Sequence, residues 1–302
     1  MTTHALATHL ADLPGTSVLA LGPDVDLSGA APDAQAQPGD IAWISPRALG
    51  SEPSRMAAFG GSLLVVPADA PPDELPAATV VAASAPKLVF SRAVEAALPH
   101  LIGDGWAPDG GPIHPEAEVA PGATLAPGVV LGAGVVIEGG ARIGPNTCIA
   151  HTTIERGATV GANCSIGLAG FGFSRDPDGA LVQFPHVGRV RIGPGAIVGS
   201  NTCIDRGSLG ETVVGAGTCI DNLVHVAHNV RIGENSLVIA LAMLGGSVTI
   251  GDRAWVAPSS AVINQKSIGD DAVVGLGAVV IRDVEPGQTV VGNPAKPLAP
   301  RS

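Results

Sequence analysis

The chain has 302 residues, only 14% of them charged, and 27 acidic against 16 basic side chains give it a net charge of −11. This balance argues against a non-specific nucleic-acid binder, which needs a basic surface. Gly and Pro interrupt every apolar stretch before it reaches about 18 residues, so we expect no integral membrane segment. The N-terminus has no basic region followed by an apolar stretch, which predicts no signal peptide and a cytoplasmic protein.

Two further features of composition bear on the interior. The four cysteines show no CxxC spacing, which in a chain without an export signal is typical of reduced thiols. Tyrosine is absent and aromatic residues make up only 3% of the chain. Something other than aromatic rings must therefore fill the core.

Residues 1–108 are predicted to form a small α/β domain. The segments "DIAWIS", "GSLLVVPA" and "ATVVAA" are typical of short strands, and "PKLVFSRAVEAALPHLI" predicts a strand leading into a helix. The Pro- and Gly-rich segment "GDGWAPDGGPIHPEA" then predicts a linker to a second domain at 109–302.

A six-residue period dominates the second domain. Large apolar residues recur at every sixth position, usually followed by Gly or an acidic residue, and a small or β-branched residue comes four places later. A helix would need spacings of three and four and a plain strand a spacing of two, so the period predicts a parallel β-helix. The apolar residues form four runs: 113 to 149, 154 to 166, 192 to 204 and 214 to 280.

Two stretches depart from the period, at 168–190 and 205–213. Excursions from a solenoid commonly cluster on a binding face. They can equally be surface loops without a function. The pattern alone leaves both interpretations open.

Four stretches, in this order, carry a resemblance to a known family: "GFGFSRDPDGALVQFPHVGRVRIG", "IDRGSLGETVVG", "IDNLVHVAHNVRIG" and "GGSVTIGD". They resemble the UDP-3-O-acylglucosamine N-acyltransferases, which are left-handed β-helix enzymes of lipid A biosynthesis. The left hand is implied by the resemblance alone, since general crossover rules would favour a right hand.

The resemblance implies a homotrimer with active sites between adjacent coils and no cofactor. It implies transfer of a 3-hydroxyacyl chain, held as a phosphopantetheine thioester on acyl carrier protein, to the 2-amino group of UDP-3-O-acylglucosamine. A cleft between subunits would supply the concave site that a smooth prism lacks.

The motif "VHVAHN" contains the candidate catalytic residue. The hexad places His228 at a corner facing out, and His225 also points away from the interior. The resemblance makes His228 the general base, a role that suits an imidazole, while His225 is a substrate contact or a surface residue. The backbone around Gly246 is a candidate oxyanion donor. Zinc would need a third histidine, His151 or His186, and we expect no metal.

Further substrate contacts are implied by the resemblance, each with a structural alternative. Asp205, Arg206, Asp221 and Asn222 would line the cleft, or form turn hydrogen bonds. Phe171 and Phe173 would wall an acyl or sugar site, or anchor their own loop. Trp43 would stack on uracil, or pack in the core of the small domain.

Two positions depart from the family pattern in one coil. Gln265 stands where family members usually carry a second histidine. Lys266 occupies the small inward slot, where an unpaired ammonium would be costly. Either the coil bulges there and turns Ile263 inward, or Lys266 reaches the cleft, and both residues count as candidate substrate contacts.

The acyl donor and the acceptor stay open. The usual tyrosine partner for uracil is missing, the chain ends where many members continue into a helix that helps to bind carrier protein, and "GNPAKPL" resembles coenzyme A-dependent sugar acetyltransferases. An acidic carrier protein would need a basic patch, for which Arg231, Arg253, Lys266 and Arg282 are candidates. The alternatives are a coenzyme A-dependent acyltransferase acting on another nucleotide-linked amino sugar, and a scaffold in which His228 is dispensable.

Overall fold

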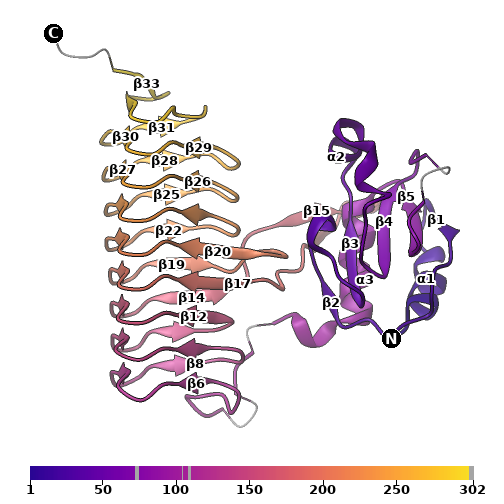
Figure 1. The fold of residues 1–302 in the computed structure, drawn as a ribbon, viewed down its shortest axis with the longest axis horizontal. Helices are drawn as coiled ribbons and strands as arrows, with labels where there is room; N and C mark the ends of the chain where they lie inside the picture. The colour runs from indigo at the N-terminus through magenta and orange to yellow at the C-terminus, as the bar shows by residue number, and fades with distance from the viewer. Residues whose placement is uncertain (72–74, 104, 108–109, 299–302) are drawn as a thin grey trace. The chain divides into compact units, whose positions relative to one another are not determined.

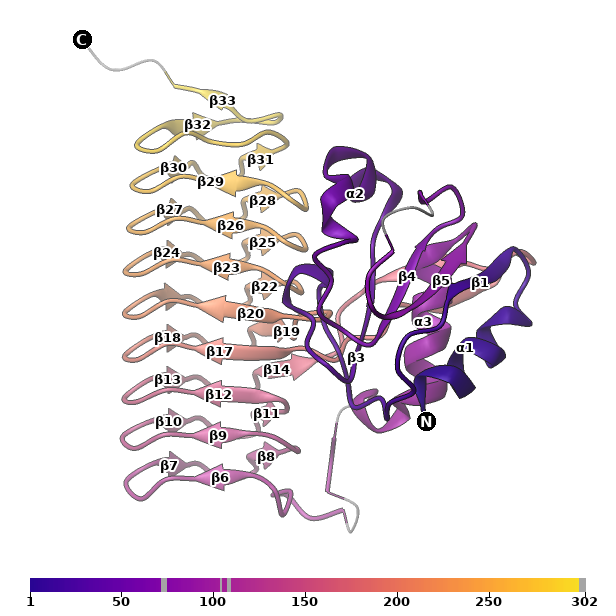
Figure 2. The ribbon, with the colours of Figure 1, turned by 45° about the vertical axis from the view of Figure 1, so that its right-hand side comes forward.

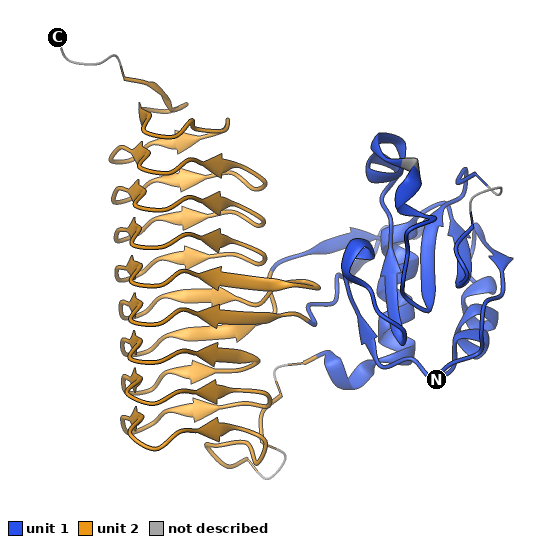
Figure 3. Ribbon diagram, in the orientation of Figure 1, with its two compact units in different colours: residues 1–102, 171–187 blue, residues 103–170, 188–302 orange. Residues whose placement is uncertain are grey.

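The computed structural model describes residues 1–71, 75–103, 105–107 and 110–298. The chain forms two compact units (Figure 3). Unit 1 comprises residues 1–102 and 171–187, and unit 2 comprises residues 103–170 and 188–302. The segment 171–187 thus belongs to the same unit as the N-terminal part of the chain.

Unit 1 is built on a five-stranded sheet in the order β1-β5-β4-β3-β2. Its strands are β1 Thr16–Ala20, β2 Gly29–Ala30, β3 Asp40–Trp43, β4 Leu63–Pro67 and β5 Thr79–Ala83. Strand β1 is an antiparallel edge, and the other four strands are parallel. Every residue of β4 and β5 is buried, as expected for parallel strands covered on both faces. The three expected strands are therefore confirmed.

The helices of unit 1 are α1 Thr3–Ala11, α2 Pro46–Ser51 and α3 Pro86–Ala97, with 3-10 turns at Asp33–Gln35, Pro53–Arg55 and Pro99–Leu101. The expected strand after residue 86 was wrong, because α3 already begins at Pro86. Proline at the first helical position presets the backbone for a helix and loses no hydrogen bond there. Among the described residues, no helix has the length and apolar character to cross a membrane.

Unit 2 is a β-solenoid of short strands stacked into three parallel sheets (Figures 1 and 2). The first sheet contains β7 Thr124–Leu125, β10 Arg142–Ile143, β13 Thr159–Val160, β18 Ile197–Val198, β21 Cys219–Ile220, β24 Leu237–Val238, β27 Trp255–Val256, β30 Val273–Val274, β32 Thr289–Val291 and the antiparallel β33 Lys296–Pro297. The second contains β8 Val130–Leu131, β11 Cys148–Ile149, β14 Ser165–Leu168, β19 Cys203–Asp205, β22 His225–Val226, β25 Met243–Leu244, β28 Ala261–Val262 and β31 Val279–Val280. The third contains β6 Glu118–Val119, β9 Val136–Ile137, β12 Thr152–Ile154, β17 Arg189–Ile192, β20 Glu211–Val214, β23 Arg231–Ile232, β26 Thr249–Ile250 and β29 Ser267–Ile268.

The interior of unit 2 confirms the six-residue period. The large apolar residue of almost every strand from β8 onward is buried, as with Ile220, Val226 and Ile232, and small residues such as Ala242 and Ala254 fill the inward corner positions. Each fully buried aliphatic side chain contributes about 1.5–3 kcal/mol of transfer free energy. Stacked aliphatic layers thus replace the aromatic core that the composition lacks. The four cysteines are free, as their spacing predicted.

The corners of the solenoid turn through residues with left-handed φ. The first corner row, between the first and second sheets, contains Gly128, Asn146, Asn163, Asn201, Leu223, Leu241, Ser259 and Gly277. The second corner row, between the second and third sheets, contains Gly134, His151, Asn229, Ser247 and Gln265. Glycine and asparagine adopt this conformation most readily.

Both excursions from the period begin at the second corner row. The first runs from the end of β14 to β17 and carries the hairpin β15 Phe173–Arg175 and β16 Leu181–Gln183, which belongs to unit 1. The second joins β19 to β20. Their shared corner is the one on which His228 lies.

The coil that contains Lys266 keeps a regular register. Strand β29 pairs with β26 without a shift, the Thr249 N–H donates to the Lys266 carbonyl (2.9 Å), and Ile263 stays 45% exposed. The alternative of a bulge that turns Ile263 inward is therefore wrong. Lys266 is half-buried. Its long flexible stem can carry the amino group out of the inward position, which a bulky branched side chain could not do.

Candidate active site

His228 lies on the second corner row, in the turn that joins β22 to β23. Its side chain is half-buried, while Val226, two residues earlier, is fully buried in the solenoid. Asn229 follows with a φ of 61° and reverses the chain into β23. The hexad therefore placed His228 correctly as an outward corner residue.

The Nδ1 atom of His228 is held by two neighbours. It lies 3.0 Å from Oδ1 of Asn229 and 3.4 Å from the Ser208 hydroxyl. The Ser208 backbone N–H donates to the same Asn229 oxygen (3.0 Å), and the Asn229 N–H donates to the Thr212 hydroxyl (2.8 Å). The second excursion thus supplies Ser208 and Thr212 to the histidine corner.

One face of the imidazole, on its Cε1–Nε2 side, lies against Gly246 in the next coil. A Cβ atom added to Gly246 would lie 2.7 Å from both Nε2 and Cε1 of His228. Only glycine leaves room for the ring in this position. The Gly246 N–H forms no hydrogen bond among the described residues, while the neighbouring Ser247 N–H donates to the His228 carbonyl (2.9 Å).

A carboxylate lies close to both histidines. Asp205 Oδ2 is 3.9 Å from Nε2 of His225, and the Asp205 side chain is only 16% exposed. Burial raises the pKa of Asp205, and the charges of His225 and His228, when protonated, oppose that rise. The corner therefore combines two imidazoles with a carboxyl group that burial pushes toward its neutral form.

Arg206 is fully buried beside this corner. Its Nη2 donates to the Gly103 carbonyl (3.1 Å), and its backbone N–H donates to the carbonyl of Leu168, where the first excursion begins. The Gly207 N–H donates to the carbonyl of Arg189, where that excursion returns (3.2 Å). The "IDRG" segment therefore ties both ends of the first excursion to the solenoid.

Asp221 and Asn222 lie at the other end of β22, on the first corner. Asp221 accepts from the N–H groups of Asn222 (2.7 Å) and Ala240 (3.2 Å), and Asn222 accepts from the Ser200 N–H (2.7 Å). These contacts correspond to the turn hydrogen bonding that was the structural alternative for the pair.

Gln265 occupies the second corner row one coil beyond Gly246. Its backbone N–H donates to the Gly246 carbonyl (2.9 Å), and its side chain is exposed. The position expected for a second histidine therefore lies on the same corner as His228, and here it carries a neutral amide.

The basic residues divide between two corners. Arg253 lies between the third and first sheets, where Asp271 holds it with two hydrogen bonds (2.8 and 2.9 Å) and raises its pKa. Arg231, Lys266 and Arg282 lie at or beside the second corner, and in the described part of the chain none of them forms an ion pair. Of the four candidates, the three at the second corner are thus the ones without an ion pair among the described residues.

Trp43 belongs to an aromatic cluster within unit 1. Its ring centroid lies 6.4 Å from that of Phe90 and 6.3 Å from that of Phe184, and Phe90 and Phe184 stack at 5.6 Å. Lys87 Nζ lies 5.0 Å from the Phe184 centroid, and burial lowers the Lys87 pKa. Trp43 is half-buried in this cluster, which agrees with a packing role and leaves part of the ring exposed.

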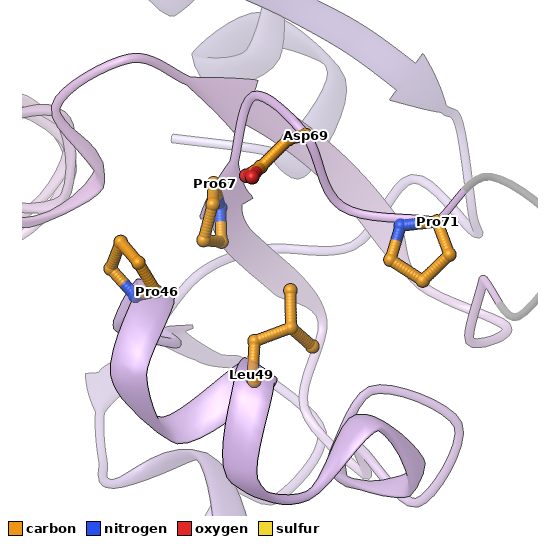
Figure 4. Close-up of a pocket in the computed structure, with 6 residues that line it drawn as sticks. Pro46, Leu49, Pro67, Asp69 and Pro71 are labelled. Atoms are coloured by element: carbon orange, nitrogen blue, oxygen red, sulfur yellow. The ribbon is translucent and has the colours of Figure 1, made fainter.

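Two other features of unit 1 could contact a ligand. Phe171 and Phe173 meet edge to face at 4.9 Å, and Phe171 is 86% exposed. A pocket of about 250 Å³ lies where β3 and β4 end (Figure 4), lined by Pro46, Leu49, Gly50, Pro67, Asp69 and Pro71. The carboxyl ends of parallel strands are a common place for ligands, but Trp43 does not line this pocket.

No group of three or more His, Cys, Asp or Glu side chains within the described ranges is arranged to hold a metal ion. Of the two candidate third ligands, His151 bonds the Gly103 carbonyl through Nε2 (3.2 Å). His186 is buried in unit 1, edge-on to Phe184.

Sequence reasoning missed the two residues that contact Nδ1 of His228. Asn229 follows the histidine directly, and Asn in a left-handed corner is common in this chain, so its position alone gave no functional signal. Ser208 is 20 residues away, in an excursion whose path the six-residue period does not specify.

The chain is 55% identical over 157 residues to a UDP-3-O-acylglucosamine N-acyltransferase of Caulobacter vibrioides. The match covers 52% of this chain and 46% of that protein. It is 50% identical over 147 residues to UDP-3-O-acylglucosamine N-acyltransferase 2 of Legionella pneumophila, covering 49% of this chain and 43% of that protein. These matches span less than half the length of either relative. No protein-family model matches the sequence.

A longer match covers most of the chain. It is 33% identical over 269 residues to a UDP-3-O-acylglucosamine N-acyltransferase of Coxiella burnetii, and it covers 80% of this chain and 74% of that protein. Among solved structures, a UDP-N-acetylglucosamine acyltransferase aligns with a TM-score of 0.51 at 20% identity, covering 61% of this chain and 72% of that chain. This structural likeness concerns the fold alone.

Proposed function

Because the chain belongs to the UDP-3-O-acylglucosamine N-acyltransferase family, we propose that it transfers a 3-hydroxyacyl chain from acyl carrier protein to the 2-amino group of UDP-3-O-acylglucosamine. The reaction would serve lipid A synthesis in the cytoplasm. The observation that carries the proposal is the outward imidazole of His228, held on Nδ1 and packed with one face against Gly246.

The chemistry assigned to this corner is amide formation. The amine nitrogen attacks the thioester carbon, and the His228 imidazole takes the proton that the amine loses. The Gly246 N–H donates to the oxyanion of the tetrahedral intermediate. The C–S bond then breaks, and the leaving thiolate takes a proton from the imidazolium.

The carrier protein is proposed to dock on Arg231, Lys266 and Arg282. Carrier proteins of this kind are strongly acidic, and these three cations lie beside the histidine corner without acidic partners among the described residues. Charge complementarity of this sort mainly raises the association rate. Neutralising Arg231 and Arg282 should raise KM for the carrier-bound donor, whereas Arg253→Gln, on a different corner, should leave it unchanged.

A homotrimer is proposed to form on the first corner row. Leu223 and Leu241 adopt left-handed φ there, which costs an L-residue about 1–2 kcal/mol, yet their side chains are 54% and 57% exposed. Met243, 42% exposed, pairs in register with His225 across the second sheet. A partner subunit on this surface would bury the leucines and approach His225.

The uridine moiety is assigned to unit 1, where Trp43 offers a partly exposed ring. The tyrosine that usually faces uracil in the family is absent, so Trp43 is the ring assigned to stack on uracil. Replacing Trp43 by Ala should raise KM for the UDP-sugar, and replacement by Phe should restore it if stacking is the interaction.

The experiment that tests the function is a mass-spectrometric transfer assay on wild type and His228→Ala. One arm offers UDP-3-O-acylglucosamine with a 3-hydroxyacyl carrier protein, and the other offers UDP-amino sugars with acetyl-CoA. Activity in the first arm that falls by about 10²–10⁴-fold in the variant supports the proposal.

Two results would overturn it. Activity only with acetyl-CoA would establish the coenzyme A-dependent alternative. Absence of product in both arms from a folded, assembled protein would favour a scaffold in which His228 has no catalytic role.

A further inference from the structure

We propose that Asn229 and Ser208 are positioning residues that fix His228 in the Nδ1–H tautomer, which makes Nε2 the basic nitrogen. The inference rests on the proposed function only in that His228 is taken as the base. Neither residue touches a reacting atom, and both act through the imidazole.

The donor and acceptor chemistry of Asn229 determines which nitrogen carries the proton. The Ser208 backbone N–H can only donate, so the Asn229 atom 3.0 Å from it must be the amide oxygen and not the amide nitrogen. That same oxygen lies 3.0 Å from Nδ1 of His228. An amide oxygen can only accept, so Nδ1 must be the donor and must carry hydrogen.

The remaining nitrogen of the neutral ring follows by elimination. A neutral imidazole has one N–H, so with Nδ1 protonated the lone pair is on Nε2. Nε2 lies across the ring from the side that Asn229 contacts, and the ring face on the Cε1–Nε2 side packs against Gly246. The basic nitrogen and the candidate oxyanion donor therefore belong to neighbouring turns of the same corner row.

The second excursion has a defined task in this arrangement. Four residues beyond the six-residue period bring Ser208 beside the next coil, where its N–H binds Asn229 and its hydroxyl lies 3.4 Å from Nδ1. Thr212, at the return of the excursion, accepts from the Asn229 N–H (2.8 Å). The backbone of Asn229 is therefore held by Thr212 and its side-chain oxygen by Ser208, which keeps that oxygen beside the histidine.

Asn229 could also occupy this position only because asparagine tolerates the corner conformation. Asn229 has a left-handed φ, and asparagines recur at such corners throughout the chain. Two variants divide the possibilities. Asn229→Gly accepts the same backbone conformation and lacks the oxygen, whereas Asn229→Asp tolerates the conformation and keeps an acceptor.

The direct test is the tautomer itself, read by long-range ¹H–¹⁵N correlation on the full chain labelled with ¹⁵N-histidine. The chain has eight histidines, and the His228 signals are identified by their loss in His228→Gln. Wild type at a pH where the ring is neutral should show protonated Nδ1 and bare Nε2. Asn229→Gly should show a tautomer mixture, while Asn229→Asp should retain protonated Nδ1.

Kinetics supply the second readout. Asn229→Gly should lower kcat by at least about tenfold, because part of the population carries the wrong tautomer, and it should leave both KM values unchanged. Asn229→Asp places a carboxylate beside the Nδ1–H and favours the imidazolium. It should keep most of kcat at high pH and move the acid limb of the kcat/KM profile to higher pH. Asp205, Arg206, His225, Arg231 and Lys266 are other titratable or charged groups around this corner, and they stay the same in both variants.

A protonated Nε2 in wild type, or an unchanged tautomer in Asn229→Gly, would overturn the inference. The tautomer is measured without substrate, so it stands apart from the transfer assay. The expected tautomers in a protein that transfers no acyl group would support the positioning role and overturn the proposed function.

Discussion

The first and second corner rows of unit 2 turn with the same backbone conformation and present different chemistry. The first row carries Leu223 and Leu241, which are exposed at a conformational cost. The second row carries Asn229, whose neighbours are His228 and the excursion residue Ser208. A regular coil turns through a left-handed residue at its corner, and the repeat does not specify the outward side chain of that residue. The difference between the two rows shows that the candidate functional residues lie at positions whose side chains the six-residue repeat does not specify.

The second row can be broken most severely at Gly246. In Gly246→Ala the new Cβ would lie 2.7 Å from Nε2 and Cε1 of His228, so the ring must leave its place. We expect kcat to fall by about 10²-fold or more, with a Tm close to that of wild type. Ser247→Gly, on the same turn, is the matched control and should retain activity. A fully active Gly246→Ala would contradict the site.

The buried interior of unit 2 should not differ from coil to coil as the corner rows do. Ile232 and Ile250 are inward residues of neighbouring coils in the third sheet, both buried to within 2%. Replacing either by Ala should cost about 2–5 kcal/mol in the free energy of unfolding. Denaturant titration checks whether the two losses agree. A loss at one site far below that at the other would mean that the coils are not equivalent.

The first row can be tested at Leu241. Asn accepts a left-handed φ more readily than Leu, so Leu241→Asn should relieve up to about 1 kcal/mol of backbone strain in the single chain. The same change removes an apolar contact from the proposed subunit interface. We expect sedimentation equilibrium to show dissociation at concentrations where wild type and Ser259→Asn remain trimeric. An intact trimer would place the interface elsewhere.

Much of the fold could be predicted, because the inward residues repeat every six positions and nothing else produces that spacing. Outward positions carry no such constraint. His228 could be placed at a corner, but its partners could not, since Ser208 reaches it through an excursion that the period does not describe. The start of helix α3 was predicted as a strand because the apolar run "LVF" also suits a strand. Pro86 occupies the first position of the helix, where proline favours helical backbone geometry.

The smallest expected effect is a pH-dependent change in stability caused by Asp205, the carboxyl group close to the histidines of the second corner row. Burial raises the pKa of Asp205 in the folded protein, so the stability linked to its proton is present below the unfolded pKa and is lost as pH rises through the folded pKa. Asp205→Asn stays neutral and escapes that loss. The Tm of the variant relative to wild type should therefore increase from pH 4 to pH 8, by a few degrees at most, in a thermal melt series. A difference that shrinks as pH rises would mean that the positive charges of His225 and His228 outweigh burial, and that Asp205 acts as a stabilising ion-pair partner in this corner.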